Sequence, residues 1–285
     1  LFDSASAPEE ASDVRDRYVP LADDPAKRRF ITDTERTDLI GTPDGGEAAL
    51  RRYYPRLGRV SEAPVDPPTS LLAVHARDRN LLFLTRSGSL QVYNETTGER
   101  TLSYRGRGMQ TAILTPRGIF VGKAAEGVFD SSVLRLTPET RETVSIETES
   151  ELVFALRYDS RRGRLFAIGV RTDEDGVPHT LVETFEGATF QRRRTILEIE
   201  GEYLEAMLVV DPVTGNAYTT LDDRGGILRW DGTRISELRR NPRHIPARIA
   251  LDGELLYAVN RDGTVSIVRR RDGETVADIH LIADA

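Results

Sequence analysis

Short apolar runs alternate with charged or glycine-containing turns along most of the chain. The C-terminal part shows this pattern most clearly. It divides into four apolar runs at residues 247–253, 254–263, 264–271 and 275–282. The second run ends in Asp262-Gly263, and an Asp-Gly pair between two apolar runs is typical of a β-hairpin turn. This segment therefore predicts four consecutive antiparallel strands.

The same four-strand unit recurs upstream, about every 40 residues. Further copies are predicted at residues 70–105, 109–149, 152–200 and 206–232. A weaker copy begins at Phe30 and ends at Tyr54. For this copy two alternatives stay open, an irregular N-terminal extension or a short helix through residues 47–54.

The polarity of the strands indicates how the units pack. Residues 81–84 and 255–259 are nearly continuous apolar runs, which predict strands buried on both faces. Residues 100–105 and 142–147 alternate instead, which predicts outer strands with one solvated face. One four-stranded unit cannot cover both of its own faces, but radially stacked neighbours can. The sequence therefore predicts an all-β protein, a β-propeller of four-stranded blades with six blades, or five or seven. A two-sheet sandwich or barrel would explain the short strands but not the repeat.

Three segments resemble the WD40-like and quinoprotein/NHL-like propeller group: residues 159–168, residues 211–218 together with 227–232, and residues 251–273. The chain has one Trp-Asp pair, Trp230-Asp231, and no Gly-His signature, so the resemblance is to a divergent relative. It implies the propeller fold from about residue 70 onward, and it implies no particular activity, because this fold supports many functions.

Composition limits the classes of function. The 285 residues suffice for one large domain, which we place at residues 28–285. The absence of cysteine excludes catalytic thiols and thiolate metal sites. The net charge of −7 disfavours a nucleic-acid partner, and no apolar run is long enough to span a membrane. The arginine clusters, among them residues 269–271, are predicted to be solvated and to protect sheet edges from aggregation.

Residues 1–27 are rich in Ala, Ser, Pro, Asp and Glu, which is typical of a flexible linker. An acidic linker of this kind would suit a periplasmic or cell-surface bacterial protein. A cytoplasmic location is the alternative.

No recognised metal or nucleotide motif occurs in the chain. None of the four histidines has metal-ligand spacing. Residues 173–176 read Asp-Glu-Asp-Gly and resemble part of a calcium loop, but Thr184 stands where a bidentate glutamate is needed. A plain hairpin turn is the favoured interpretation, and no cofactor is expected.

The candidate binding residues follow from the geometry of a propeller blade. The turns between second and third strands and the links between blades lie at the same end, which we call the link end. Two of these loops, residues 124–131 and 172–179, are predicted to be long, and long loops on rigid scaffolds tend to be functional. The candidates at the link end are Arg107, Glu126, Asp130, Asp173, Asp175, His179, Tyr203, Asp223, His244 and Arg261.

A scaffold without a recognisable catalytic cluster favours a non-catalytic function, namely protein–protein interaction or assembly, with a protein as the partner. One alternative is a propeller hydrolase, lactonase or lyase that acts on a sugar-like substrate through converging carboxylates and a histidine. Another is a small-ligand or glycan sensor.

Overall fold

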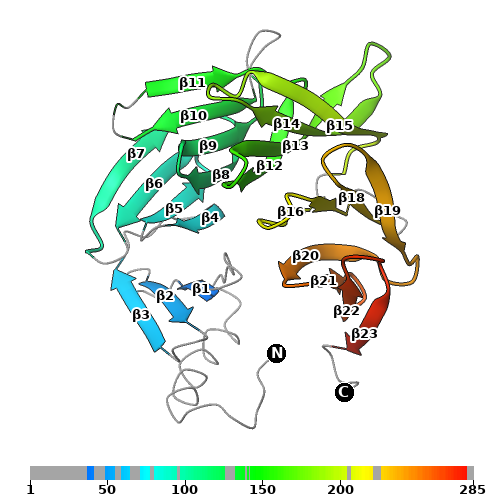
Figure 1. The fold of residues 1–285 in the computed structure, drawn as a ribbon. Helices are drawn as coiled ribbons and strands as arrows, with labels where there is room; N and C mark the ends of the chain where they lie inside the picture. Colours follow the sequence, from blue (N-terminus) through cyan, green and yellow to red (C-terminus); the bar gives the residue numbers. More distant parts are fainter. Residues whose placement is uncertain are drawn as a thin grey trace. The chain divides into compact units, whose positions relative to one another are not determined.

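The computed structural model describes residues 37–41, 49–54, 59–64, 71–77, 80–94, 97–125, 132–138, 140, 142–203, 207–220 and 226–280. Side chains are described from His75 onward. All regular secondary structure in these residues is β, and every paired strand runs antiparallel to its neighbour (Figure 1). The strands form one three-stranded and five four-stranded sheets, each built from consecutive strands. The predicted four-strand unit is therefore confirmed.

The chain divides into two compact units, Leu1–Gly106 and Arg107–Ala285. The first unit holds the three-stranded sheet of β1 (Thr37–Gly41), β2 (Ala49–Tyr54) and β3 (Arg59–Pro64). Its other sheet consists of β4 (Leu71–Arg77), β5 (Asn80–Thr85), β6 (Ser89–Asn94) and β7 (Arg100–Arg105).

The second unit holds four sheets of four strands. The first consists of β8 (Met109–Thr115), β9 (Gly118–Lys123), β10 (Val133–Thr137) and β11 (Glu142–Ile146). The second consists of β12 (Leu152–Asp159), β13 (Arg164–Thr172), β14 (Pro178–Glu186) and β15 (Arg192–Glu200). The last two consist of β16 (Leu208–Val210), β17 (Ala217–Thr219), β18 (Gly226–Trp230) and β19 (Ile235–Arg240), and of β20 (Pro246–Asp252), β21 (Leu255–Asn260), β22 (Thr264–Arg269) and β23 (Thr275–His280).

Neighbouring sheets of the second unit pack through their first strands. Strand β12 contacts β8 on one side and β16 on the other, and β16 contacts β20. A cluster that contains Phe120 and Phe185 fills the space between the first two sheets, and a cluster that contains Phe166 and Trp230 fills the next space. A third cluster, around Tyr218 and Leu256, joins the last two sheets. Each sheet thus covers an apolar face of the next, as the repeat requires.

The weak N-terminal copy is a sheet in the structure. Residues 49–54 form strand β2, so the alternative of a short helix is wrong. Strand β3 follows it, although the sequence pattern did not predict a strand at residues 59–64. Phe30 and the predicted linker at residues 1–27 lie outside the described residues. Six blades therefore remain a prediction, with six sheets in the described part of the chain.

Two further expectations need correction. The loop predicted at residues 172–179 is only a short turn, because Thr172 and Pro178 pair and the strands continue to them. Proline can begin a strand because its missing N–H need not join the ladder at that position. Of the loop predicted at residues 124–131, residues 126–131 lie outside the described part.

Arginines also join neighbouring sheets at the end opposite the link end. Nη2 of Arg162 donates to the carbonyl of Val213 in the next sheet at 3.2 Å, and its guanidinium lies against Gly215. A Cβ at Gly215 would lie 2.4 Å from Cζ of Arg162, and the φ of +78° also favours glycine. Arg270 was predicted to be solvated, but its Nη1 lies 2.6 Å from Oδ2 of the buried Asp211. These contacts connect consecutive sheets of the second unit.

Candidate functional site

The predicted link-end residues fall in several parts of the structure. Glu126, Asp130 and Asp223 lie outside the described residues. The others occupy the following positions: Arg107 before β8, Asp173 and Asp175 in the β13–β14 turn, His179 in β14, Tyr203 after β15, His244 before β20 and Arg261 in the β21–β22 turn.

The structure brings Asp173 and His179 together at the tip of the β13–β14 hairpin. Nε2 of His179 lies 3.1 Å from Oδ2 of Asp173, and its Nδ1 lies 3.2 Å from Oε1 of Glu198 on β15. Nη2 of Arg171 donates to the same Glu198 oxygen at 2.6 Å. Both nitrogens of His179 therefore contact a carboxylate, and the cluster joins the turn to two strands.

The turn itself is organised by Asp173. Its Oδ1 accepts hydrogen bonds from the main-chain N–H groups of Asp175 and Val177, at 3.0 and 2.8 Å. The bond from Val177 is the largest influence that lowers the pKa of Asp173, and His179 and Asp175 act in the same direction. Because both carboxylate oxygens are used within the hairpin, the geometry favours the interpretation of residues 173–176 as a plain turn. Glu174 and Asp175 are exposed at its tip.

His244 belongs to a different cluster. Its Nδ1 lies 2.5 Å from Oδ2 of Asp262 in the β21–β22 turn, which ties the link before β20 to that turn. The hydroxyl of Thr264 donates to Oδ1 of Asp262 at 2.7 Å. This bond is the largest influence that lowers the pKa of Asp262 to about 2. The contacts of His244 are those of a residue that fixes a loop.

Asn260 extends this cluster into the sheet. Its Nδ2 donates to the hydroxyls of Thr264 and Ser266 at 2.8 and 2.9 Å. The Ser266 hydroxyl in turn donates to Oδ1 of Asp278 on β23 at 2.5 Å. Each hydroxyl gives its proton to a carboxylate, so each must accept from Asn260, and this fixes the orientation of the amide. A hydrogen-bonded chain thus runs from the link to the outer strand.

Tyr203 lies in the link that follows β15. Its main-chain N–H donates to Oγ1 of Thr180 at 3.0 Å, and that hydroxyl donates to the carbonyl of Gly201 at 2.7 Å. The Tyr203 side chain packs against the cluster around Phe166 and Trp230. The described contacts therefore give Tyr203 a packing role between two sheets.

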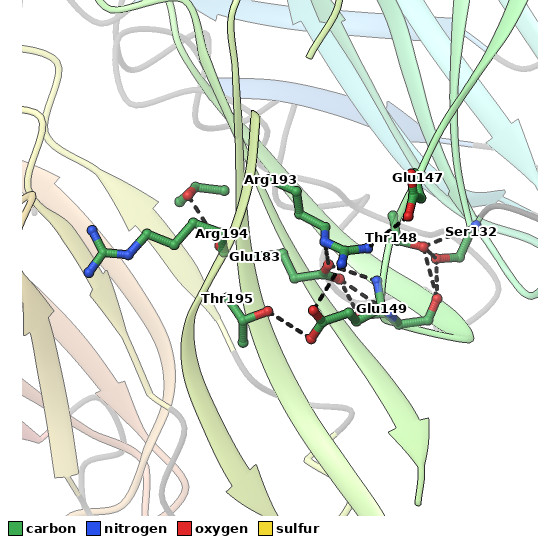
Figure 2. A network of polar contacts seen from close by, with 10 residues as sticks. Ser132, Glu147, Thr148, Glu149, Glu183, Arg193, Arg194 and Thr195 are labelled. Atoms are coloured by element: carbon green, nitrogen blue, oxygen red, sulfur yellow. Dashed lines mark hydrogen bonds and ion pairs between the residues drawn. The ribbon is translucent and has the colours of Figure 1, made fainter. Parts of the chain in front are cut away.

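Sequence reasoning missed a network around Glu183, a fully buried carboxylate in β14 (Figure 2). Its oxygens accept from the main-chain N–H groups of Glu149 and Ser150, at 2.9 and 3.3 Å, and from the Ser150 hydroxyl at 2.6 Å. Glu149 and Ser150 belong to the link between β11 and β12. The signal in the sequence was a charged residue inside the apolar run at residues 180–185. A buried carboxylate needs such donors.

Arg193 completes the charge balance of this network. Its Nη2 lies 3.0 Å from Oε1 of Glu149, and its Nε lies 4.0 Å from Oε1 of Glu183. The hydroxyl of Thr195 donates to the other Glu149 oxygen at 2.9 Å. Figure 2 shows these side chains converging on the link from two neighbouring strands of the sheet. The network anchors a link between sheets through charged hydrogen bonds.

Comparison with known proteins identifies the fold. No protein-family model matches the chain, and no curated relative is found. The solved structures that it resembles include the computationally designed Ika8 protein (TM-score 0.56, 10% identity, 89% of this chain and 88% of that chain). Another is the Cps50 (Swd1) β-propeller domain of Myceliophteria thermophila (0.62, 11%, 91% and 88%). A third is a protein from Bacteroides fragilis provisionally assigned as a 6-phosphogluconolactonase (0.56, 13%, 87% and 82%).

The chain has the β-propeller fold. The predicted fold class and the resemblance to a divergent propeller are thereby confirmed, while identities this low carry no information on activity. In the described part of the propeller, no group of three or more His, Asp or Glu side chains could hold a metal ion. Within the same residues, no helix is long and apolar enough to cross a membrane.

Proposed function

We propose that this propeller is a non-catalytic scaffold that binds a protein partner through the link end of the sheet β12–β15. The observation that carries the proposal is that some side chains of the β13–β14 hairpin hold its structure and others are left exposed. Asp173, His179 and Glu198 are used to fix the hairpin, whereas Glu174 and Asp175 at its tip are exposed. A rigid hairpin with exposed charges suits recognition of another surface.

The charge of this end defines the kind of partner surface. Besides Glu174 and Asp175, the exposed residues here include Glu200 and Glu202, at and just after the end of β15. A surface with this excess of carboxylates favours a basic partner and a salt-dependent association.

The proposal is tested by affinity capture from the source cells with the full chain, followed by quantitative mass spectrometry. The test variant is Glu174→Gln/Asp175→Asn. The control, Asp252→Asn/Glu254→Gln, makes the same charge change in an exposed turn at the other end of a different sheet. We expect the tip variant to lose a partner that the wild type and the control retain. Equal recovery with all three proteins, or no specific partner with any of them, would refute the proposal.

The alternative function is a hydrolase, lactonase or lyase, and the likeness to the Bacteroides fragilis structure is the observation in its favour. It is tested by incubating the purified chain with sugar lactones, with and without added calcium, and following ring opening. Hydrolysis well above the spontaneous rate, together with unchanged partner capture by the tip variant, would replace the scaffold proposal by the enzyme.

We further propose a periplasmic or cell-surface location, which rests on the composition of residues 1–27. Fractionation of the source cells tests it. Recovery of the protein with a cytoplasmic marker would refute it and favour the cytoplasmic alternative.

A further inference from the structure

The described residues contain five Asp-Gly pairs, and each lies at a turn between two antiparallel strands. They are Asp175-Gly176, Asp231-Gly232, Asp252-Gly253, Asp262-Gly263 and Asp272-Gly273. Because glycine has no side chain, its main-chain nitrogen can be approached closely by the preceding side chain. An aspartate before glycine is therefore unusually open to attack by its own main chain.

This attack is the first of two steps that together conserve all atoms. The glycine nitrogen bonds to the side-chain carboxyl carbon, an imide ring closes, and the carboxyl hydroxyl leaves as water with the proton of the nitrogen. Water then opens the ring at either carbonyl carbon. One opening restores aspartate, and the other gives isoaspartate, in which the main chain runs through the former side chain. The first step needs a protonated carboxyl group that is free to turn towards the glycine nitrogen.

Three of the five pairs are held in the folded structure. A carboxylate oxygen of Asp262 and one of Asp272 accept the main-chain N–H two residues further on, at 3.0 and 3.1 Å. The N–H groups of Gly176, Gly263 and Gly273 donate to main-chain carbonyls of their own turns, at 3.1, 3.1 and 2.9 Å. In these pairs the carboxyl group, the attacking nitrogen or both are therefore restrained.

The carboxylate of a fourth pair, Asp231-Gly232, is held although its glycine is not. Oδ1 of Asp231 accepts the hydroxyl and the main-chain N–H of Thr233, at 2.6 and 2.9 Å, and the N–H of Arg234 at 3.0 Å. The Thr233 hydroxyl is the largest influence that lowers the pKa of Asp231, so the protonated form is scarce. This exposed turn is the closest match to the one that follows β20.

The pair Asp252-Gly253, between β20 and β21, lacks these restraints. The Asp252 carboxylate has no hydrogen bond or ion pair with the described residues, and the Gly253 N–H has no main-chain acceptor among them. Both residues are exposed. Apart from the neighbours in the chain, no heavy atom lies within 4 Å of the position that a Cβ of Gly253 would take. The carboxyl group can therefore turn onto the glycine nitrogen in the folded protein.

We propose that Asp252 is a site of spontaneous isomerisation to isoaspartate, and that in the folded protein it reacts faster than the other four described Asp-Gly pairs. Isoaspartate adds one carbon to the main chain at the end of β20, where Asp252 pairs with Leu255. The adjoining pair, Leu251 and Leu256, packs in the cluster around Tyr218. The longer main chain cannot keep both pairs in register, so the modification weakens the β20–β21 hairpin. This site is independent of the hairpin tip of the proposed scaffold function.

The test ages the purified full chain for several weeks in mildly acidic buffer at physiological temperature. Proteolysis, chromatographic separation of the isomeric peptides and electron-transfer mass spectrometry then quantify isoaspartate at each pair. We expect more isoaspartate at Asp252 than at any other described pair. The excess over Asp262 should be about tenfold or more, because the pKa of Asp262, about 2, makes its protonated form scarce compared with that of a free aspartate.

Ageing the chain in guanidinium chloride is the control for neighbouring sequence. Unfolding releases both turns, so Asp231 and Asp252 should then react at similar rates. A preference for Asp252 that is as large in the unfolded chain as in the folded one would overturn the proposal. In the folded chain, isoaspartate at Asp231 that equals or exceeds that at Asp252, or its absence from Asp252, would do the same.

The matched variant is Asp252→Glu, which keeps the carboxylate but would have to close a larger and less favourable ring. Urea denaturation compares fresh and aged protein. We expect the unfolding midpoint of the wild type to fall on ageing, and that of Asp252→Glu to change less. An equal fall in both proteins would show that isomerisation at Asp252 does not weaken the hairpin, contrary to the proposal.

Discussion

The sheets β12–β15 and β20–β23 have similar second strands but differ in how these are buried. In β13, residues 165–170 are all buried. In β21, Leu256 and Ala258 are buried, whereas Val259 is 38% exposed. Strand β13 contributes to an apolar cluster on each face of its sheet, with Leu165 and Ala167 in one cluster and Phe166 and Ile168 in the other. Two strands with equally apolar sequences therefore differ in how many of their side chains are buried.

This difference corrects an expectation about residues 255–259, which were predicted to be buried on both faces. Their sequence is as apolar as that of β13, so the pattern alone could not separate the two strands. The burial of a strand's side chains depends on the tertiary packing around it, and the sequence of a single strand does not encode that packing. Mutations in the two strands should therefore lower the free energy of unfolding by clearly different amounts.

The largest effect is expected for Phe166→Ala in β13. Phe166 is fully buried and makes an edge-to-face contact with Trp230 at 5.5 Å between ring centroids. Its removal leaves a cavity between two sheets and should cost about 3–5 kcal/mol of unfolding free energy. The comparison is Val259→Ala in β21, which should cost less than about 0.5 kcal/mol because the side chain is exposed. Urea denaturation measures both, and similar losses would contradict the difference between the strands.

A smaller effect is expected at the buried network of the first sheet. Glu183→Gln replaces one acceptor oxygen by an NH₂ group that faces the N–H and O–H donors of the link. Leaving such groups unsatisfied should cost about 1–3 kcal/mol. The control is Glu254→Gln in the exposed turn before β21, which should be nearly neutral. Equal stability of the two variants in urea would mean that Glu183 does not anchor the link.

The network also shows where sequence reasoning stops. The strands of the repeat were predicted because alternation and turn chemistry are local signals, and the four runs predicted at residues 247–282 correspond to β20–β23. That Glu183 meets Glu149 and Ser150 depends on side chains more than 30 positions apart, which no local pattern records.

The candidate site was predicted unevenly for the same reason. Asp173 and His179 lie six positions apart on one hairpin, and the structure joins them. Tyr203 packs against the cluster around Phe166 and Trp230, and His244 contacts Asp262, and neither contact follows from a local pattern in the sequence. Arg270 was wrongly predicted to be solvated. Its partner Asp211 belongs to the preceding sheet, and no local pattern in the sequence reveals this contact.

Arg270 therefore provides a comparison between adjacent arginines. Arg270 has a side-chain exposure of 16% beside the buried Asp211, whereas Arg271 has an exposure of 74% and pairs with the partly exposed Asp272. Arg270→Ala should cost about 1.5–3 kcal/mol, because it removes a hydrogen bond to an enclosed carboxylate. Arg271→Ala should cost less than about 0.5 kcal/mol, because exposed ion pairs contribute little. Denaturation curves of the two variants that superimpose would show that Arg270 does not join the sheets.

The smallest effect concerns the pH dependence of the sheet β20–β23. Asp262 has a pKa of about 2 in the folded protein, chiefly because the Thr264 hydroxyl donates to it, against about 3.9 in an unfolded chain. A carboxyl whose pKa is lowered on folding stabilises the folded state above the unfolded value, and this contribution is lost as the pH falls towards 2. The advantage of wild type over Asp262→Asn in free energy of unfolding should thus be constant above about pH 5 and shrink between about pH 4 and 2.

Thr264→Val removes the chief donor but keeps the main-chain N–H, so it should reduce the same pH dependence in part. Urea denaturation across this range measures all three proteins, and a wild-type advantage that does not change with pH would show that the Asp262 carboxylate does not hold the link in the way its contacts indicate.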